Sequence, residues 1–224
     1  MISPPAKASP LILVRWRSGP PRRLDLTAGG SCVLLGPSGS GKSAVMQAVA
    51  SAASTAAVDV ALFGVACGPG VGAGARASLR HRLGVMLQDV RLADELSVIG
   101  NLALAATAAG RRFADYRSDA LEVLAWVGLK SRLFDAAAEL DAEGRRRLAL
   151  ARALVNGPDV LIADEPTEGL AAKARNGLLR LVGDVHAAGT AVLLATRDPS
   201  LASASGGEVT DLSAPQDAEL AGAA

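Results

Sequence analysis

Eight consecutive residues in the first quarter of the chain have the spacing of a phosphate-binding loop. They fit the pattern G-x-x-x-x-G-K-[ST] and read Gly36-Pro37-Ser38-Gly39-Ser40-Gly41-Lys42-Ser43. Glycines allow backbone N–H groups to turn toward phosphate oxygens at close range. Lys42 is long enough to reach the β- and γ-phosphates of a nucleotide, and the Ser43 hydroxyl can bind Mg²⁺. The motif therefore predicts a site for a nucleotide polyphosphate together with Mg²⁺.

The residues on either side of this loop support the prediction. Val33-Leu34-Leu35 is a short apolar run, as expected for a buried parallel strand. Residues 44–50 read as a helix, whose N-terminus would add its positive dipole end at the phosphates. A Gly/Ser-rich linker that contained Gly-Lys-Ser by chance would not need the strand, loop and helix in this order.

A second motif, Asp164-Glu165, directly follows the apolar run at residues 160–163. Phosphoryl transfer depends on positioning and charge neutralisation, so an acidic residue is expected at the end of a strand near the phosphate loop. Asp164 would hold Mg²⁺, through water, and Glu165 would orient or deprotonate an attacking water at the sheet edge where α/β proteins bind ligands. Without the upstream loop, Asp164-Glu165-Pro166-Thr167 would be interpreted as an ordinary turn.

Two further side chains have the chemistry to join this site. Gln88 follows another short apolar run, and its amide could touch Mg²⁺ or the lytic water. Trp16 lies on an early apolar segment, 20 residues before Gly36. It could stack on a nucleotide base, although a tryptophan of the core or the surface is an equally good interpretation.

Alternating strands and helices must position these motifs. Strands are predicted at 11–17, 22–26, 33–35, 58–63, 83–87, 159–163 and 190–195, and helices at 44–50, 95–108, 116–127, 143–156 and 170–186. The first two strands would form a hairpin, and 67–74 reads as a flexible Gly-rich connection. The predicted fold class is α/β: a P-loop NTPase with a mostly parallel sheet, a small antiparallel N-terminal β part and an inserted helical subdomain.

The length of 224 residues and an apolar content of 50% allow one large α/β domain with a sizeable core. We expect this domain to span 11–212, with the helical subdomain at about 90–157. Residues 1–10 and the tail at 213–224 are expected to be disordered.

Charge and hydropathy restrict the partners. A net charge of +1 gives no support for nucleic-acid binding. The first residues lack a signal-peptide core, and no stretch reaches the roughly 18 apolar residues of a membrane span, so work at a membrane would require a partner. Cys32 and Cys67 fit no metal-ligand spacing and are interpreted as inert, buried thiols.

The order of the phosphate loop, Gln88 and Asp164-Glu165-Pro166-Thr167 resembles the nucleotide-binding domain of ABC ATPases over most of the chain. Within that family the segments 83–92, 114–117, 124–129 and 149–153 look most similar to the FtsE group of cell-division ATPases. The lipoprotein-release and macrolide-export ATPases are the competing groups. The resemblance implies ATP and Mg²⁺ as ligands, ATP hydrolysis, and a second ATPase subunit in a homodimer or a heterodimer. It further implies an FtsX-like integral membrane partner and a peripheral position on the cytoplasmic face of the inner membrane.

Three features of the chain depart from the pattern that the resemblance implies. The family signature is Leu-Ser-Gly-Gly-Glu or close to it and contacts the γ-phosphate bound by the other subunit, but here it reads Leu140-Asp141-Ala142-Glu143-Gly144. Asp141 would bring a like charge to that phosphate, and the side chains of Ala142 and Glu143 would block close backbone approach. Arg197 stands where the family has its switch histidine. It can stabilise phosphate charge but cannot accept a proton from water. Ala171 replaces an expected aspartate.

These departures predict a subunit that binds Mg-ATP but hydrolyses it slowly, or only with a suitable partner. A regulatory subunit that uses ATP only as a ligand is one alternative, and a small-molecule P-loop kinase is another. The Asp164-Glu165 pair, Gln88 and the helical insert argue against the kinase. The run Arg145-Arg146-Arg147 is interpreted as a solvated helix face, with a phosphate or partner contact as the alternative.

Overall fold

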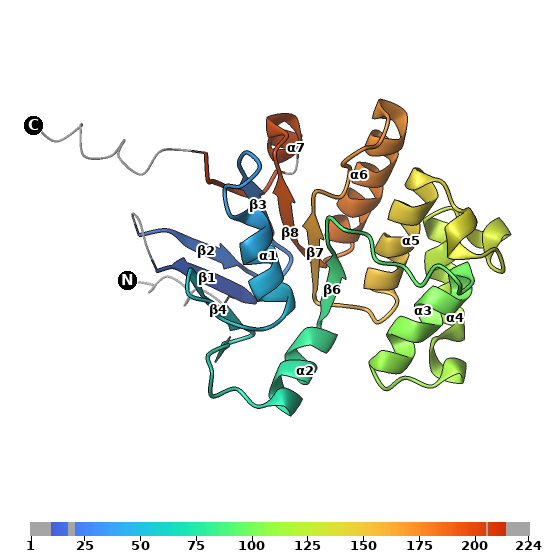
Figure 1. The fold of residues 1–224 in the computed structure, drawn as a ribbon, viewed down its shortest axis with the longest axis horizontal. Coiled ribbons are helices and arrows are strands. Elements are labelled where there is room, and N and C mark those ends of the chain that lie inside the picture. The colour runs from blue at the N-terminus through green and yellow to red at the C-terminus, as the bar shows by residue number, and fades with distance from the viewer. Residues whose placement is uncertain (1–9, 18–20, 205, 214–224) are drawn as a thin grey trace, which may run out of the picture.

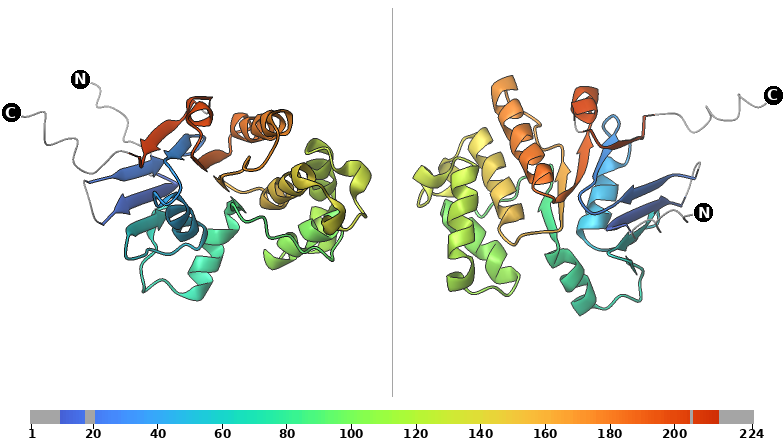
Figure 2. Two further views of the ribbon diagram at one scale, coloured as in Figure 1. Left: turned by 45° about the horizontal axis from the view of Figure 1, so that its top comes forward. Right: turned by 180° about the vertical axis from the view of Figure 1, so that it is seen from behind.

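A computed structural model describes residues 10–17, 21–204 and 206–213 (Figure 1). The expected disordered ends, 1–10 and 213–224, lie almost entirely outside these ranges. The described chain has three parts. A parallel sheet lies in the middle, an antiparallel sheet lies at one end, and a group of helices lies at the other, as all three views agree (Figures 1 and 2). The α/β fold class predicted from the sequence is confirmed.

The parallel sheet carries the loops that matter for chemistry. Its strand order is β6-β7-β8-β3-β9, and each neighbouring pair is parallel. The strands are β3 (Ser31–Leu35), β6 (Leu83–Met86), β7 (Val160–Asp164), β8 (Ala191–Thr196) and β9 (Glu208–Asp211). The sequence predicted all of these except β9, a largely exposed edge strand whose polar residues carry no apolar signal.

The antiparallel sheet has the order β2-β1-β4-β5. Its strands are β1 (Ile12–Trp16), β2 (Arg23–Leu26), β4 (Val58–Leu62) and β5 (Val65–Ala66). The predicted hairpin is present, because Ile12 of β1 lies opposite Leu26 of β2. Strand β4 pairs along the other edge of β1, which extends the hairpin into a sheet.

The helices connect and cover the sheets. They are α1 (Lys42–Ala50), α2 (Ala73–His81), α3 (Val98–Ala108), α4 (Phe113–Trp126), α5 (Ala142–Leu154), α6 (Ala172–Ala187) and α7 (Pro199–Ala204), with short 3₁₀ turns at Lys130–Arg132 and Ala137–Glu139. Helices α3, α4 and α5 pack against one another within the range proposed for the helical subdomain. None of the helices in the described ranges is both long and apolar enough to cross a membrane.

The prediction of a flexible connection over 67–74 is wrong at its C-terminal end, where α2 begins at Ala73. The helix presents little apolar surface, and Leu79 is its one buried side chain. Arg76 holds it in place by donating to the carbonyl oxygens of Ala52, Gly68 and Val71, at 2.9–3.0 Å. These tertiary hydrogen bonds stabilise a segment whose local sequence favours a loop.

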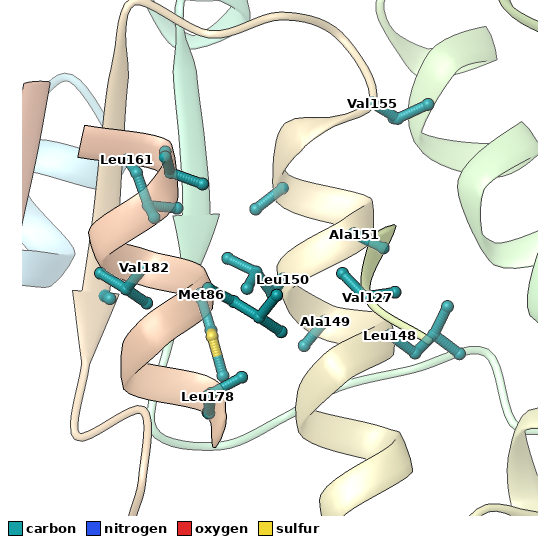
Figure 3. Packing of buried hydrophobic residues seen from close by; sticks show 14 of the residues in the cluster. Met86, Val127, Leu148, Ala149, Leu150, Ala151, Val155, Leu161, Leu178 and Val182 are labelled. Atoms are coloured by element: carbon teal, nitrogen blue, oxygen red, sulfur yellow. The ribbon is translucent and has the colours of Figure 1, made fainter. Parts of the chain in front are cut away.

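Alternate residues of the parallel strands face two separate cores. On β7, Leu161 and Ala163 belong to the core shared with α3–α6, whereas Val160 and Ile162 face α1 and the antiparallel sheet. In the first core Met86 of β6 lies between side chains of α5 and α6, including Leu150 and Leu178 (Figure 3). Both faces of the sheet are therefore covered, which explains why its strands read as continuous apolar runs.

Helix α5 approaches strand β6 closely enough to exclude any side chain at Gly84. A Cβ atom there would lie 2.5 Å from the carbonyl oxygen of Ala153 and 2.9 Å from Cγ of Pro158. Glycine is required because the backbones of the helix and the strand are in direct contact. This contact joins the helical group to the strand that leads into Gln88.

Candidate nucleotide site

The phosphate loop connects the end of β3 to the start of α1, as its sequence predicts. Gly41 directly precedes the helix with φ at 93°, a left-handed conformation that glycine adopts without strain. Helix α1 starts with Lys42, so the loop leads straight into the helix N-terminus. The first N–H groups of a helix have no intrahelical acceptor and are suited to bind an anion.

The Lys42 ammonium is buried beneath this loop, and the side chain of the residue is only 6% exposed. It donates to the carbonyl oxygens of Gly36 and Pro37, at 2.6 and 2.9 Å. It also lies 3.8 Å from Oε1 of Glu165. The cation is thus held between the phosphate loop and the acidic motif, where a polyphosphate would meet both.

The acidic pair stands at the end of β7, next to β8. Asp164 is 2% exposed and Glu165 is 9% exposed. Glu165 has a φ of 44°, which is unusual for a residue with a side chain, and its N–H donates to the carbonyl oxygen of Ala195. Unusual backbone conformations of this kind gather at functional sites. The turn directs the two carboxylates to the same edge of the sheet as the phosphate loop.

Burial raises the pKa of both carboxyl groups, because it penalises their charged forms. For Asp164 the hydroxyl of Ser43 and the charge of Lys42 oppose this shift of the pKa. For Glu165 the charges of Lys42 and Arg197 oppose it. A positive ion bound next to these groups would favour their charged forms.

Among the described residues three buried side-chain oxygens have no hydrogen-bond partner, and two of them, Oγ of Ser40 and Oδ1 of Asp164, belong to this site. Ser43 and Gln88 line two adjoining cavities here, of about 330 and 750 Å³, and Asp164 lines the larger one. A buried carboxylate oxygen without a donor, next to a hydroxyl and an amide oxygen, is a donor set that suits Mg²⁺. The three residues predicted as metal ligands are therefore brought together.

Gln88 and Arg197, which lie far apart in the sequence, are joined through Glu168. The Gln88 amide nitrogen donates to Oε2 of Glu168 at 2.7 Å, and the Arg197 guanidinium forms an ion pair with Oε1 of the same carboxylate. Arg197 also donates to Oγ of Ser38 in the phosphate loop, at 3.4 Å. The sequence reading missed Glu168, although a third acidic residue in the turn after Asp164-Glu165 was a signal that could have found it.

The interpretation of Arg145-Arg146-Arg147 as a solvated helix face is wrong, because all three side chains are partly buried and bind their own chain. Arg145 pairs with Asp94 at 2.8 Å, and Arg147 pairs with Glu143 at 2.6 Å. Arg146 donates to the carbonyl oxygens of Gln88 and Glu168, at 3.2 and 3.4 Å. Arg146 therefore ties α5 to the two segments that carry the polar network.

The altered signature forms the first turn of α5. Asp141 caps the helix, since its Oδ1 accepts from the N–H of Gly144 at 2.8 Å. Ala142 and Glu143 occupy the first helical positions. In this segment, the Asp141 and Glu143 side chains both bind groups of their own helix.

Three other residues singled out in the sequence lie outside the two cavities. Trp16 is half-buried, pairs across the sheet with Val58 and packs on the core of the antiparallel sheet. It lines neither of the two cavities, so a contact with a base remains a prediction. Cys32 and Cys67 are both buried, and burial raises the pKa of the Cys32 thiol to about 11. A thiol with this pKa is protonated and unreactive at neutral pH.

Similar proteins are known in sequence and in structure. The chain is 35% identical to the lipoprotein-releasing system ATP-binding protein LolD of Shewanella sp. (strain MR-7) over 181 residues, which cover 80% of this chain and 78% of LolD. It is 30% identical to the macrolide export ATP-binding/permease protein MacB of Pectobacterium atrosepticum over 179 residues, which cover 80% of this chain but 28% of MacB.

Two solved structures share the fold at lower identity. The dimeric structure of MJ0796, a bacterial ABC transporter cassette, matches with a TM-score of 0.76 and 23% identity, over 91% of this chain and 93% of that one. The cbiO1 structure from Clostridium perfringens, part of an ABC transporter complex, matches with a TM-score of 0.79 and 20% identity, over 91% of this chain and 85% of that one. The sequence profile of the ABC transporter family matches residues 21–168. On these grounds the chain belongs to the ABC transporter family of ATP-binding domains.

Proposed function

We propose that this chain binds Mg-ATP and serves as the ATP-binding subunit of an ABC complex. One observation carries the proposal. Buried Lys42 and buried Glu165 line one cavity at the start of α1, and buried Asp164, with its unpartnered oxygen, lines the adjoining cavity. Ser43 and Gln88 line both cavities. Burying these groups is costly unless a ligand completes their interactions. A polyphosphate with a divalent cation supplies the matching negative and positive charges.

Each residue would have a distinct part in binding and hydrolysis. The loop Gly36–Ser43 and the ammonium of Lys42 would hold the phosphates, and Ser43, Asp164 and Gln88 would hold Mg²⁺. The ion would neutralise charge that develops on the phosphates during transfer. Glu165 would orient the attacking water and accept its proton, because its carboxyl group lies beside Lys42 and its raised pKa improves it as a base.

Hydrolysis in a homodimer is proposed to be slow. The neighbouring subunit of such a dimer would present Asp141, Ala142 and Glu143 to the γ-phosphate in place of a serine and two glycines. A carboxylate so close to a phosphate is repelled. The serine hydroxyl is lost and the added side chains hold the backbone N–H groups away from the phosphate, so these donors would stabilise the transition state less well. A heterodimer whose other subunit has an unaltered signature would restore hydrolysis at the loop of this chain.

Binding and turnover of ATP by the purified chain test this proposal. We expect calorimetry to detect Mg-ATP binding that Lys42→Ala abolishes, while Lys130→Ala, which removes an exposed lysine in the helical group, leaves it unchanged. Turnover is expected well below 1 s⁻¹, near the low end of the range for enzymes. Glu165-dependent turnover on the order of 1 s⁻¹ or faster would contradict slow hydrolysis. Absence of ATP binding would contradict the function itself.

For the pathway, lipoprotein release or export is the first candidate, because LolD and MacB are the named relatives. The chain would then act on the cytoplasmic face of the inner membrane, bound to the membrane subunit of such a transporter. An FtsE-type role in cell division with an FtsX-like partner is the second candidate, favoured by the similarity of segments 83–92 and 124–129. A regulatory subunit that binds but does not hydrolyse ATP is consistent with either pathway.

The membrane protein that co-purifies with the tagged chain separates these candidates. Capture of a lipoprotein-releasing or export permease would support the first, and capture of an FtsX-like protein would support the second. A second ATPase subunit in the same complex would identify a heterodimer. Unchanged ATP binding with no Glu165-dependent turnover in the complete complex would indicate the regulatory role.

A further inference from the structure

Glu168 lies at the centre of a polar network that reaches every segment around the phosphate cavity. Its carboxylate accepts from the Gln88 amide at 2.7 Å and forms an ion pair with Arg197, and its carbonyl oxygen accepts from Arg146. Its N–H donates to the carbonyl oxygen of Glu165 at 3.1 Å. The side chain is 28% exposed, so the ion pair is partly protected from water.

Arg197 is placed to bind a phosphate as well as Glu168. Its guanidinium bonds Oγ of Ser38 in the phosphate loop and lines the cavity of about 330 Å³ together with Lys42, Ser43 and Glu165. A guanidinium has several N–H groups and binds a carboxylate or a phosphate through an adjacent pair of them. Nη1 of Arg197 contacts Ser38, so a phosphate that takes both Nη1 and Nη2 must displace the carboxylate paired with Nη2. Glu168 supplies that carboxylate in the structure.

We propose that Glu168 is an internal competitor of the nucleotide for Arg197, and that Arg197 transfers from Glu168 to the terminal phosphate when ATP binds. This inference rests on the proposed function, because it requires the nucleotide to bind at the phosphate loop. Arg197 is then a phosphate-binding residue, and Glu168 is a positioning residue that lowers the affinity for ATP.

The proposal predicts discrimination between nucleotides. Arg197 shares its cavity with Lys42, whose position in the motif reaches the β- and γ-phosphates. A triphosphate would therefore offer Arg197 a terminal phosphate that a diphosphate lacks. When Arg197 moves to the phosphate, Glu168 keeps its hydrogen bond to Gln88 but loses its counter-ion. The free-energy cost of ATP binding therefore depends on both Arg197 and Glu168.

A double-mutant cycle on the full chain tests the competition, with the dissociation constants of Mg-ATP and Mg-ADP as readouts. Glu168→Gln removes the charge but keeps an oxygen that can accept from Gln88. We expect this variant to bind ATP roughly three- to tenfold more tightly, the effect of releasing a partly exposed ion pair, and to bind ADP with a change below about twofold. In an Arg197→Ala background the same change should alter ATP affinity by less than about twofold.

A matched control is Asp25→Asn, which removes one charge from the exposed Arg23–Asp25 ion pair on β2 and should change neither nucleotide affinity. Thermal melting confirms that each variant folds, and Arg197→Gln replaces Arg197→Ala if the alanine variant does not. An equal gain from Glu168→Gln with and without Arg197 would overturn the proposal, since it would indicate direct repulsion of phosphate. If Glu168→Gln bound ATP with the affinity of the unaltered chain, the proposal would be overturned too. Loss of ATP binding in every protein, the unaltered chain included, would overturn the proposed function as well.

Discussion

Two polar regions of this chain treat their hydrogen-bonding groups in opposite ways. At the phosphate loop, Oγ of Ser40 and Oδ1 of Asp164 are buried without a partner, and the carboxyl groups of the acidic pair have raised pKa values. At the start of α5, Asp141 caps its own helix and Glu143 pairs with Arg147. The first region leaves polar atoms without hydrogen-bond partners, available to a ligand, whereas the polar groups of the second region are paired within the chain.

Under the proposed function, this difference indicates which half of a nucleotide site the chain would retain. The resemblance to ABC ATPases implies a site made of a phosphate loop from one subunit and a signature from the other. Here the loop side remains dependent on a ligand, and the signature side has become a self-contained helix start. The proposed function accordingly expects the chain to bind ATP itself and to complete the site of a neighbour poorly.

The largest expected effect comes from removing the ammonium group of Lys42 at the phosphate loop. Lys42→Ala should weaken Mg-ATP binding by roughly 100-fold or more, because it deletes a buried charge that pairs with Glu165 and that would pair with phosphate in the proposed site. Calorimetric titration measures the change. A loss below about fivefold would mean that the loop does not bind phosphate in the proposed way.

Replacing the altered signature residues at the start of α5 should give the next largest effect. The triple change Asp141→Ser, Ala142→Gly and Glu143→Gly restores the first four residues of the family signature, Leu-Ser-Gly-Gly, and should raise homodimer turnover by at least about tenfold. The same change should lower the free energy of unfolding by about 1–3 kcal/mol, because two glycines enter a helix and the Glu143–Arg147 pair is lost. Steady-state phosphate release and denaturant unfolding measure the two effects. Unchanged turnover would separate the signature from slow hydrolysis.

A single change tests whether Asp141 serves mainly as a helix cap. Asp141→Ala should lower the free energy of unfolding by about 1 kcal/mol through loss of the bond to the N–H of Gly144. It should leave the ATP affinity of the isolated chain unchanged, since the residue lines neither cavity at the phosphate loop. Asp141→Asn, which retains a capping oxygen, is the matched control and should keep most of the stability.

The smallest expected effect is a gain in stability rather than a loss. Burial raises the pKa of Asp164 above the ordinary value of 3.8, so the native state binds this proton more tightly than the unfolded chain does. The group therefore stabilises the fold below that value and loses this contribution as pH rises through its raised pKa. At neutral pH Asp164→Asn should raise the melting temperature of the ligand-free chain by a few degrees at most.

Melting curves across pH check this expectation, because the gain should disappear as pH falls below the ordinary value of 3.8, where the carboxyl group is protonated in the folded and the unfolded chain alike. Saturating Mg-ATP should raise the melting temperature of the unaltered chain more than that of the variant. A lower melting temperature for Asp164→Asn at neutral pH would mean that the carboxylate already has a stabilising partner in the ligand-free chain.

The sequence predicted the parts of this molecule that depend on local spacing. The phosphate loop, Asp164 and Glu165 form compact motifs next to apolar strands, so their position at one sheet edge follows from the strand order of the fold. Helix α2 and strand β9 were not predicted. Helix α2 is stabilised by tertiary hydrogen bonds through Arg76, and β9 is defined by its backbone pairing with β3. Both segments lack an apolar pattern of their own.

The polar network around Glu168 could not be predicted for a different reason. Its hydrogen bonds join residues separated by 80 positions in one case and 22 in another, and no spacing rule connects them. The same holds for the three arginines of α5, whose run of like charges is typical of a solvated face. Only the fold reveals that each of them meets a carboxylate or a carbonyl oxygen of its own chain.

The contact at Gly84 holds the C-terminal end of α5 against the parallel sheet, so a tilt of the helix about this contact would displace its N-terminal end most. The helix has 13 residues and is therefore about 20 Å long, with its C-terminal end resting on β6 and Asp141 at its other end. A tilt of about 5° at the Gly84 contact would move Asp141 by roughly 1.7 Å over that length. Arg146, near the distal end, grips the carbonyl oxygens of Gln88 and Glu168. A small displacement of the Gln88 segment would therefore move Asp141 farther than Arg146, at the end of the helix that the proposed function assigns to contact with a second subunit.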